Sequence, residues 1–123
     1  MVSNNLGFVL LFVKNVTISA DFYGKLFNLK PVEQAPTFAL FVLGNGVKLG
    51  LWSRYTAEPL VMAEPGAAEI CFNTDDVDEA YAQWGKFGIA VAQAPTDMDF
   101  GRTFVALDPD GHRIRVFKLH PES

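Results

Sequence analysis

The spacing of apolar residues along the chain changes twice from one typical of a β-strand to one typical of an α-helix. Residues 6–13 (LGFVLLFV) form an apolar run typical of a buried strand. Behind a potential N-cap, Asn15, apolar side chains recur every three to four residues, which predicts an amphipathic helix. The positions on this first helix are Val16, Ala20, Tyr23 and Phe27. The same spacing returns behind a second N-cap, Asp76. The positions on the second helix are Val77, Ala80, Tyr81 and Trp84.

Each predicted helix is followed by a segment that predicts a β-hairpin. ALFVLGNGVKLGLW places Asn45-Gly46 between strand-like runs, and TFVALDPDGHRIRVF places Asp110-Gly111 in the same way. Both dipeptides favour the positive φ of a two-residue turn. The order βαβββ therefore occurs twice, which predicts an α+β fold in a single domain over residues 1–123. The first module covers about 6–53, a Pro- and Gly-containing linker covers about 54–66, and the second module covers about 67–119.

Two-residue turns fix which residues oppose each other across the hairpins. In the first hairpin, Phe41 is expected opposite Gly50 and Ala39 opposite Trp52. In the second hairpin, the expected pairs are Phe104 with Phe117 and Ala106 with Arg115. Strand alternation then turns Arg113, Arg115 and Phe117 away from the helix, with Phe8, Leu10 and Phe12 doing the same in the first strand. The face of each sheet opposite its helix is thus expected to be rich in aromatic side chains.

The composition of the chain limits the kinds of molecule that the protein is expected to bind. The net charge of −4 and the absence of a Lys/Arg cluster argue against nucleic acid or an anionic membrane, so the expected partner is a small molecule. A single cysteine, Cys71, allows neither an intramolecular disulfide nor a Cys/His metal cluster. Residues 6–13 are too short to span a bilayer and lack the features of a signal peptide. These features predict a cytoplasmic protein.

The paired modules, the DPDGHRIRV ending and the FGRTF before it resemble the vicinal oxygen chelate superfamily. This superfamily holds glyoxalase I, extradiol dioxygenases, fosfomycin-modifying enzymes and bleomycin resistance proteins. The resemblance implies that the modules form a half-open cup, often completed across a homodimer by module exchange. It also implies that metal-dependent members carry His or Gln on the first strand of a module and Glu on the last.

Those four ligand positions fall on Phe8, Gly50, Glu69 and Arg115, so only Glu69 could bind a divalent cation. His112, expected to face the core, and His120, in the tail, do not replace the others. The resemblance therefore implies a protein with no metal and no cofactor. Arg115 could instead pair with Glu69, bind the carboxylate of a ligand, or lie on a solvated face as an ordinary strand arginine.

LWSR together with DMDFGRTFVALDPDGHRIRV resembles the metal-free drug-binding branch, and within it the phenazine-antibiotic resistance proteins. This resemblance implies metal-independent sequestration of a planar aromatic antibiotic or metabolite, which would confer resistance. A lyase, an isomerase or another enzyme of the superfamily, with Glu69 as base, is the alternative. A homodimer is expected, since one module cannot close a cup and its aromatic face needs cover.

Trp52 is the residue expected to stack on a planar ligand, with core packing at a strand end as the alternative. Tyr55, near Leu60 and Met62 in the linker, is interpreted either as part of a lid or as cover for the core edge. Cys71 is interpreted as a small wall of the cup rather than a nucleophile. The full set of expected ligand-binding residues is Trp52, Phe8, Phe41, Phe104, Phe117, Arg115, Glu69, Tyr55 and Phe100, the last in a loop with Asp97 and Asp99.

Overall fold

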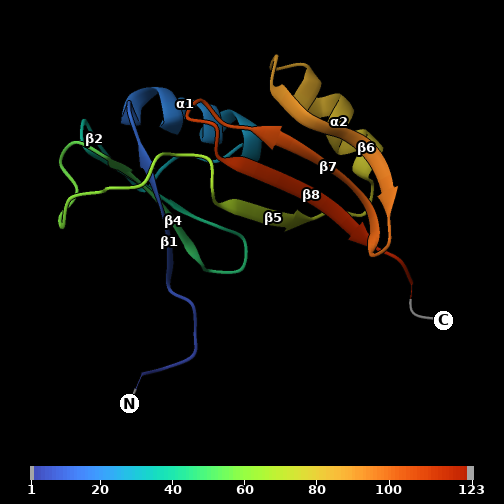
Figure 1. Ribbon diagram of the computed structural model, residues 1–123, viewed down its shortest axis with the longest axis horizontal. Coiled ribbons are helices and arrows are strands. Elements are labelled where there is room, and N and C mark those ends of the chain that lie inside the picture. Colours follow the sequence, from blue (N-terminus) through green and yellow to red (C-terminus); the bar gives the residue numbers. More distant parts are fainter. Residues whose placement is uncertain (1, 122–123) are drawn as a thin grey trace. The chain divides into compact units, whose positions relative to one another are not determined.

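The computed structural model describes residues 2–121, and the chain divides into two compact units between Ala63 and Glu64 (Figure 1). The first unit contains β1 (Phe8–Val13), α1 (Val16–Phe27), β2 (Glu33–Ala35), β3 (Phe38–Val42) and β4 (Lys48–Ser53). The second unit contains β5 (Glu69–Asn73), α2 (Val77–Gly85), β6 (Ala90–Met98), β7 (Gly101–Leu107) and β8 (Arg113–Leu119). The α+β class and the repeated βαβββ order predicted from the sequence are confirmed. Within residues 2–121, no helix is long and apolar enough to cross a membrane.

The first unit is a mixed sheet in the order β1-β4-β3-β2, in which β1 runs parallel to β4 and the other pairs are antiparallel. Helix α1 begins behind Asn15, whose side chain accepts a hydrogen bond from the Ile18 amide at 3.0 Å, as the sequence predicts. It packs one face against the sheet. The core between them contains the fully buried side chains of Val13, Tyr23, Phe41, Leu49 and Leu51.

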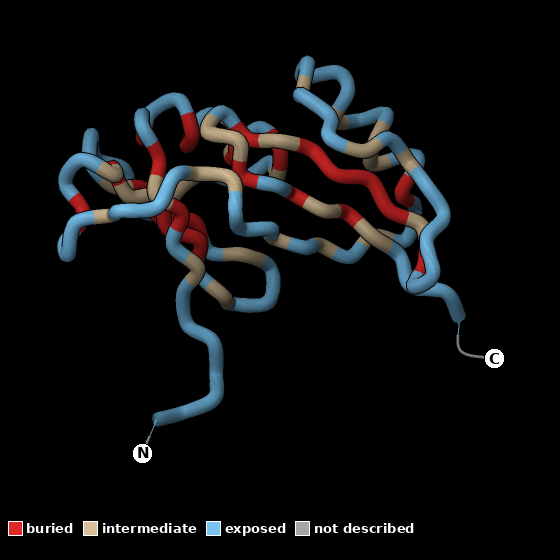
Figure 2. Tube along the Cα trace, viewed as in Figure 1, coloured by how far each residue is buried: buried red, intermediate tan, exposed pale blue. Residues whose placement is uncertain are grey.

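The second unit repeats this arrangement in the order β5-β8-β7-β6, with α2 over one face of the sheet (Figure 1). Asp76 caps α2 by accepting from the Glu79 amide at 3.0 Å. Burial is concentrated in the central strands β7 and β8, whereas α2 and the edge strand β6 are mostly exposed (Figure 2). The register of β6 against β7 shifts twice around Gln93, close to Pro95. Proline is tolerated in an edge strand because its missing N–H is not needed by a neighbour there.

Both hairpins have three-residue loops, so the predicted two-residue turns are wrong. In the first hairpin, the Leu43 amide donates to Val47 O at 2.9 Å and the Gly46 amide donates to Leu43 O at 2.9 Å. Gly46 takes the left-handed conformation, with φ of +88°, at the third loop position. This is the type I turn followed by a left-handed residue that joins many three-residue hairpins.

The loop at residues 109–111 has the same form. Here the Asp108 amide donates to His112 O at 2.9 Å, the Gly111 amide donates to Asp108 O at 3.0 Å, and φ of Gly111 is +86°. One extra loop residue shifts the first strand of each hairpin, β3 or β7, by one position relative to its partner strand, which exchanges the two faces of β3 and of β7, whereas β4 and β8 keep the predicted facing.

The partners across the hairpins change accordingly. Phe38 lies opposite Trp52 and Leu40 opposite Gly50, while Val116 lies opposite Phe104. Phe41 and Phe104 are therefore core residues on the helix side of their sheets, 0% and 1% exposed, and the prediction that they line the face opposite the helix is wrong. Ala39 and Ala106 move to the core with them.

Candidate functional site

An apolar face lies on the side of the first sheet opposite α1. Phe8, Leu10, Phe38 and Trp52 line an open hollow of about 490 Å³ on it, and these four residues are called the apolar face below. Alternation explains the arrangement, because Leu11 and Val13 turn inward in the same strand. Phe8 and Leu10 are 47% and 39% exposed. Contiguous exposed apolar residues of this kind mark binding surfaces on proteins.

Trp52 lies between two other aromatic rings. Its partner across the parallel pair, Phe12, has its ring centroid 6.2 Å away at an interplanar angle of 34°. Phe38 meets the indole edge-on, at 6.5 Å and 88°. At the rim, the Lys48 ammonium lies 5.3 Å from the centroid of the Phe8 ring. The indole is thus held in place by its neighbours while Trp52 itself is only half-buried.

Gly50 forms the floor of the apolar face. A Cβ atom at this position would lie 2.5 Å from Leu10 Cδ2 and 3.2 Å from Phe38 Cε1. Real Cβ atoms do not approach carbon that closely, so any side chain at residue 50 would displace Leu10. The absence of a side chain lets Leu10 and Phe38 close over the centre of the sheet.

The corresponding face of the second sheet is polar, and Arg115 is its centre. Arg115 Nε donates to Glu69 Oε2 at 2.9 Å and Nη2 donates to Oε1 at 3.3 Å, so the pair is bidentate. Nη1 donates to Gln93 Oε1 at 3.3 Å and to Thr103 Oγ1 at 3.2 Å. The Arg115 side chain is 15% exposed, and Phe100 places its ring 6.0 Å from the guanidinium carbon. Three interpretations of Arg115 were considered. A solvated strand arginine is wrong, because the side chain is largely buried. The ion pair with Glu69 is formed.

The carboxylate of Glu69 is held by a second arginine as well. Arg113 Nη2 lies 2.9 Å from Glu69 Oε1, and its side chain is 45% exposed. Hydrogen bonding to Arg115 is the main reason that the pKa of Glu69 lies below its usual range, although partial burial opposes it. Burial and the neighbouring Glu69 carboxylate raise the pKa of the Cys71 thiol, which donates to Glu69 Oε2 at 3.7 Å. A thiol with a raised pKa is a poor nucleophile at neutral pH.

Three other residues predicted to bind a ligand fall in different places. Phe117 is half-buried on the polar face, opposite Thr103. Phe100 is 39% exposed beside Arg115, whereas Tyr55 in the linker is 71% exposed. Leu60 and Met62 are 71% and 84% exposed, so the interpretation that they cover the core edge is wrong. The sequence reasoning missed Phe38, Gln93 and Thr103, because the register it used turned Phe38 and Thr103 to the other side.

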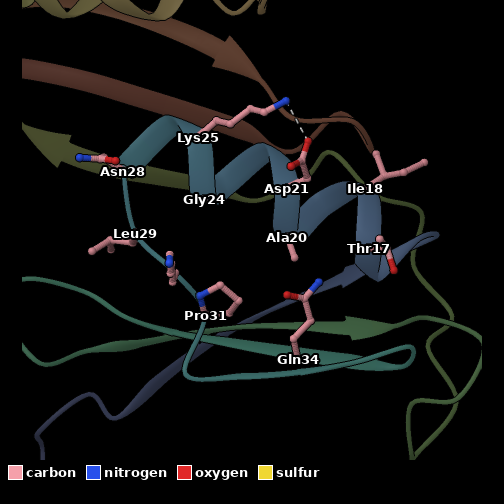
Figure 3. Close-up of a pocket in the computed structure, with 11 residues that line it drawn as sticks. Thr17, Ile18, Ala20, Asp21, Gly24, Lys25, Asn28, Leu29, Pro31 and Gln34 are labelled. Carbon is pink, nitrogen blue, oxygen red and sulfur yellow. Dashed lines mark ion pairs between the residues drawn. The ribbon is translucent and has the colours of Figure 1, made fainter.

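Another hollow of the first unit lies beside α1. It measures about 750 Å³ and separates α1 from the segment that leads into β2 (Figure 3). Its lining combines apolar residues, such as Leu29 and Pro31, with the exposed Lys25–Asp21 ion pair of α1, which is 3.0 Å long. None of the residues predicted from the sequence to bind a ligand lines this hollow. The apolar face is smaller, but its aromatic walls suit a ligand better.

Comparison with known proteins agrees with this fold. Residues 5–116 match the Glyoxalase/Bleomycin resistance protein/Dioxygenase superfamily. The chain belongs to this superfamily. It is 36% identical over 116 residues to the phenazine antibiotic resistance protein EhpR of Enterobacter agglomerans, covering 89% of this chain and 88% of EhpR. The solution structure of protein ATC0852 from Agrobacterium tumefaciens is 45% identical, with a TM-score of 0.86 over 97% of this chain and 100% of that one. A glyoxalase-related enzyme from Fulvimarina pelagi shares the fold at 20% identity, with a TM-score of 0.81 over 94% of this chain and 88% of that one.

The superfamily includes metal-dependent members, and the positions that the resemblance assigns to their ligands can be tested here. Phe8 and Gly50 offer no donor atom, and a side chain at Gly50 would collide with Leu10. In the second unit, Arg115 occupies both oxygens of Glu69, the one carboxylate at these positions. Across residues 2–121, no three His, Cys, Asp or Glu side chains gather closely enough to hold a metal ion. The residues at these positions therefore do not fit a metal ion.

Proposed function

We propose that this protein binds a planar aromatic small molecule, of the phenazine type, on the apolar face of the first unit and sequesters it unchanged. The observation that carries the proposal is the hollow of about 490 Å³ walled by Phe8, Leu10, Phe38 and Trp52. Flat aromatic walls favour flat aromatic ligands, because stacking adds about 0.5–1.5 kcal/mol to the apolar area that is buried. The 36% identity to a phenazine antibiotic resistance protein supports a role in resistance.

Binding without a metal ion is part of the proposal. Chelation of a divalent cation needs several oxygen, nitrogen or sulfur donors around one point. The assigned positions supply a single carboxylate, whose charge two guanidinium groups already neutralise at 2.9 Å each. An added cation would have to displace both arginines while lying within a few ångströms of their positive charge.

The chemistry of the second unit favours binding over catalysis. A general base works best with a pKa near the operating pH, whereas the pKa of Glu69 is lowered by its hydrogen bonds to Arg115. The raised pKa of Cys71 leaves its thiol protonated. An enzymatic alternative that uses Glu69 or Cys71 therefore lacks an activated group at that residue.

The test is a calorimetric titration with phenazine-1-carboxylic acid. We expect Trp52→Ala to weaken binding at least tenfold, equivalent to about 1.4 kcal/mol. The matched control is Ile18→Ala, which removes a side chain that is 56% exposed on α1, and it should leave the affinity unchanged. Mass spectrometry of the recovered ligand should show no change in mass. Equal affinity in the Trp52 variant, or a modified ligand, would overturn the proposal.

A further inference from the structure

A second apolar cavity lies between α2 and the sheet of the second unit, on the opposite side from Arg115. It measures about 230 Å³. Its main walls are the side chains of Tyr81, Trp84, Ile89, Val91, Phe104 and Ala106. Phe104 and Ala106 are 1% exposed, whereas Val91 is 44% exposed, so the cavity has a closed inner end and a side that reaches solvent.

The internal repeat explains why side chains of the second unit do not fill this space. Helix α1 has 12 residues but α2 has only 9, so the last turn of the first helix has no counterpart. Pairing the helix starts Val16 and Val77 places Gly88 where the first unit has Phe27. Pairing the turn glycines places Ala106 where the first unit has Phe41.

In the first unit those two phenylalanines fill the equivalent space. The ring of Phe27 stacks on Tyr23 at 6.0 Å and 21°, and Phe41 is fully buried, with Cε1 4.0 Å from the site of a Cβ on Gly24. The second unit replaces both rings by glycine and alanine. Phe104 compensates only partly, because it lies two residues earlier in its strand than Ala106.

The walls that remain suit an aromatic guest. Tyr81 and Trp84 each meet the Phe104 ring edge-on, with centroids 5.3 Å apart at 71° and 89°. These edge-on contacts fix how the three rings are oriented around the space. Enclosed apolar cavities of about 150 Å³ bind benzene, and an apolar guest in an apolar space gains dispersion contacts with its walls.

We propose that this cavity is a second binding site, which takes an apolar aromatic molecule of one or two rings. The site lies in the second unit, whereas the apolar face lies in the first, and it does not depend on the function proposed for that face. Its smaller volume, about 230 Å³ against about 490 Å³, selects compact ligands over tricyclic ones.

The test uses toluene and methyl NMR spectra of the full-length wild-type protein. We expect saturable shifts at the methyl groups of Ile89 and Val91, with those of Leu10 on the apolar face unchanged. Ala106→Leu, which extends a buried side chain into the space, should weaken toluene binding at least tenfold while retaining the wild-type fold by circular dichroism. Trp52→Ala is the matched control and should retain full toluene affinity.

Three outcomes of the toluene experiment would contradict the proposal. Absent or non-saturable shifts in the wild-type protein would overturn it even if the Ala106 variant failed to fold. Shifts confined to Leu10 would mean that toluene binds the apolar face instead. Loss of toluene binding in Trp52→Ala would have the same meaning, whereas loss of phenazine binding alone would concern only the function proposed above.

Discussion

Removing Arg115 should destabilise the second unit through the carboxylate that it leaves behind. Arg115→Ala deletes two hydrogen bonds to Glu69 and the donors to Gln93 and Thr103. Charge-assisted hydrogen bonds contribute about 1.5–3 kcal/mol when buried, and exposed ion pairs about 0.2–1 kcal/mol. The side chains of Arg115 and Glu69 are 15% and 28% exposed, between these cases. We therefore expect the free energy of unfolding to fall by about 2 kcal/mol, or roughly 8 °C in Tm.

A double-mutant cycle separates the ion pair from the other effects of the substitution. Arg115→Ala leaves the Glu69 carboxylate with the more exposed Arg113 beside it. In a Glu69→Gln background no such carboxylate remains, so Arg115→Ala should cost about 1 kcal/mol less. Urea unfolding followed by circular dichroism gives the free energy of unfolding of the wild type, the two single variants and the double variant. Arg113→Ala is the matched control, because Arg113 contacts the same carboxylate at 2.9 Å but is 45% exposed. It should cost about 0.5 kcal/mol.

The pH dependence has a defined sign. The pKa of Glu69 is lowered in the folded state from the ordinary value of 4.5. Its contribution to stability is therefore fully present above pH 4.5 and is lost as the pH falls through the lowered pKa. The penalty of Arg115→Ala should shrink over the same range. Additive effects at pH 7 would refute the ion-pair reasoning, and a loss of affinity restricted to ligands with a carboxylate would assign Arg115 to the ligand instead.

Three further predictions concern the metal, the oligomer and the register. The purified protein should contain no stoichiometric divalent metal, and EDTA should leave its Tm unchanged; elemental analysis and a chelator-dependent melting curve check this. Light scattering at micromolar concentration should give the mass of a homodimer, since Phe8 and Leu10 expose apolar area that needs cover; a monomer would contradict it. Phe41→Ala should lower the free energy of unfolding by about 3–5 kcal/mol and Phe38→Ala by at most about 1.5 kcal/mol. Of these two variants, only Phe38→Ala should weaken phenazine binding directly. A larger loss of stability in Phe38→Ala than in Phe41→Ala would mean that the two faces of β3 are exchanged.

The repeated pattern of the sequence was sufficient to predict the order of helices and strands, and it offered the central ion pair as one of three interpretations of Arg115. Both helices begin behind the N-caps Asn15 and Asp76, because these side chains satisfy amide groups that the helix leaves free. The repeat also placed Glu69 and Arg115 on adjacent parallel strands with the same facing, and their pairing follows from strand alternation. These features depend on local spacing, which the sequence records directly.

The prediction of which residues line each face depended on the length of the hairpin loops, and that length was wrong by one residue. The sequence contained evidence for the longer loop, but the two-residue turn expected from Asn-Gly and Asp-Gly was preferred. A two-residue turn needs positive φ at Asp110 as well as Gly111. Among residues 2–121, Asn28 is the one non-glycine residue with positive φ, so Asp110 does not meet that condition.

Pro109 and Asp108 favour the other turn. Proline fixes φ near −65°, which suits the first central position of a type I turn, with Asp before it and Gly at the fourth position. DPDG has this order. The Asp108 carboxylate also accepts from the Asp110 and His112 amides at 2.9 and 2.8 Å, which holds the loop closed. Choosing the turn from the proline rather than from the Asp-Gly pair would have moved Phe104 into the core. Applied through the repeat to the first hairpin, a three-residue loop over residues 44–46 (GNG) would have placed Phe38 rather than Phe41 beside Trp52.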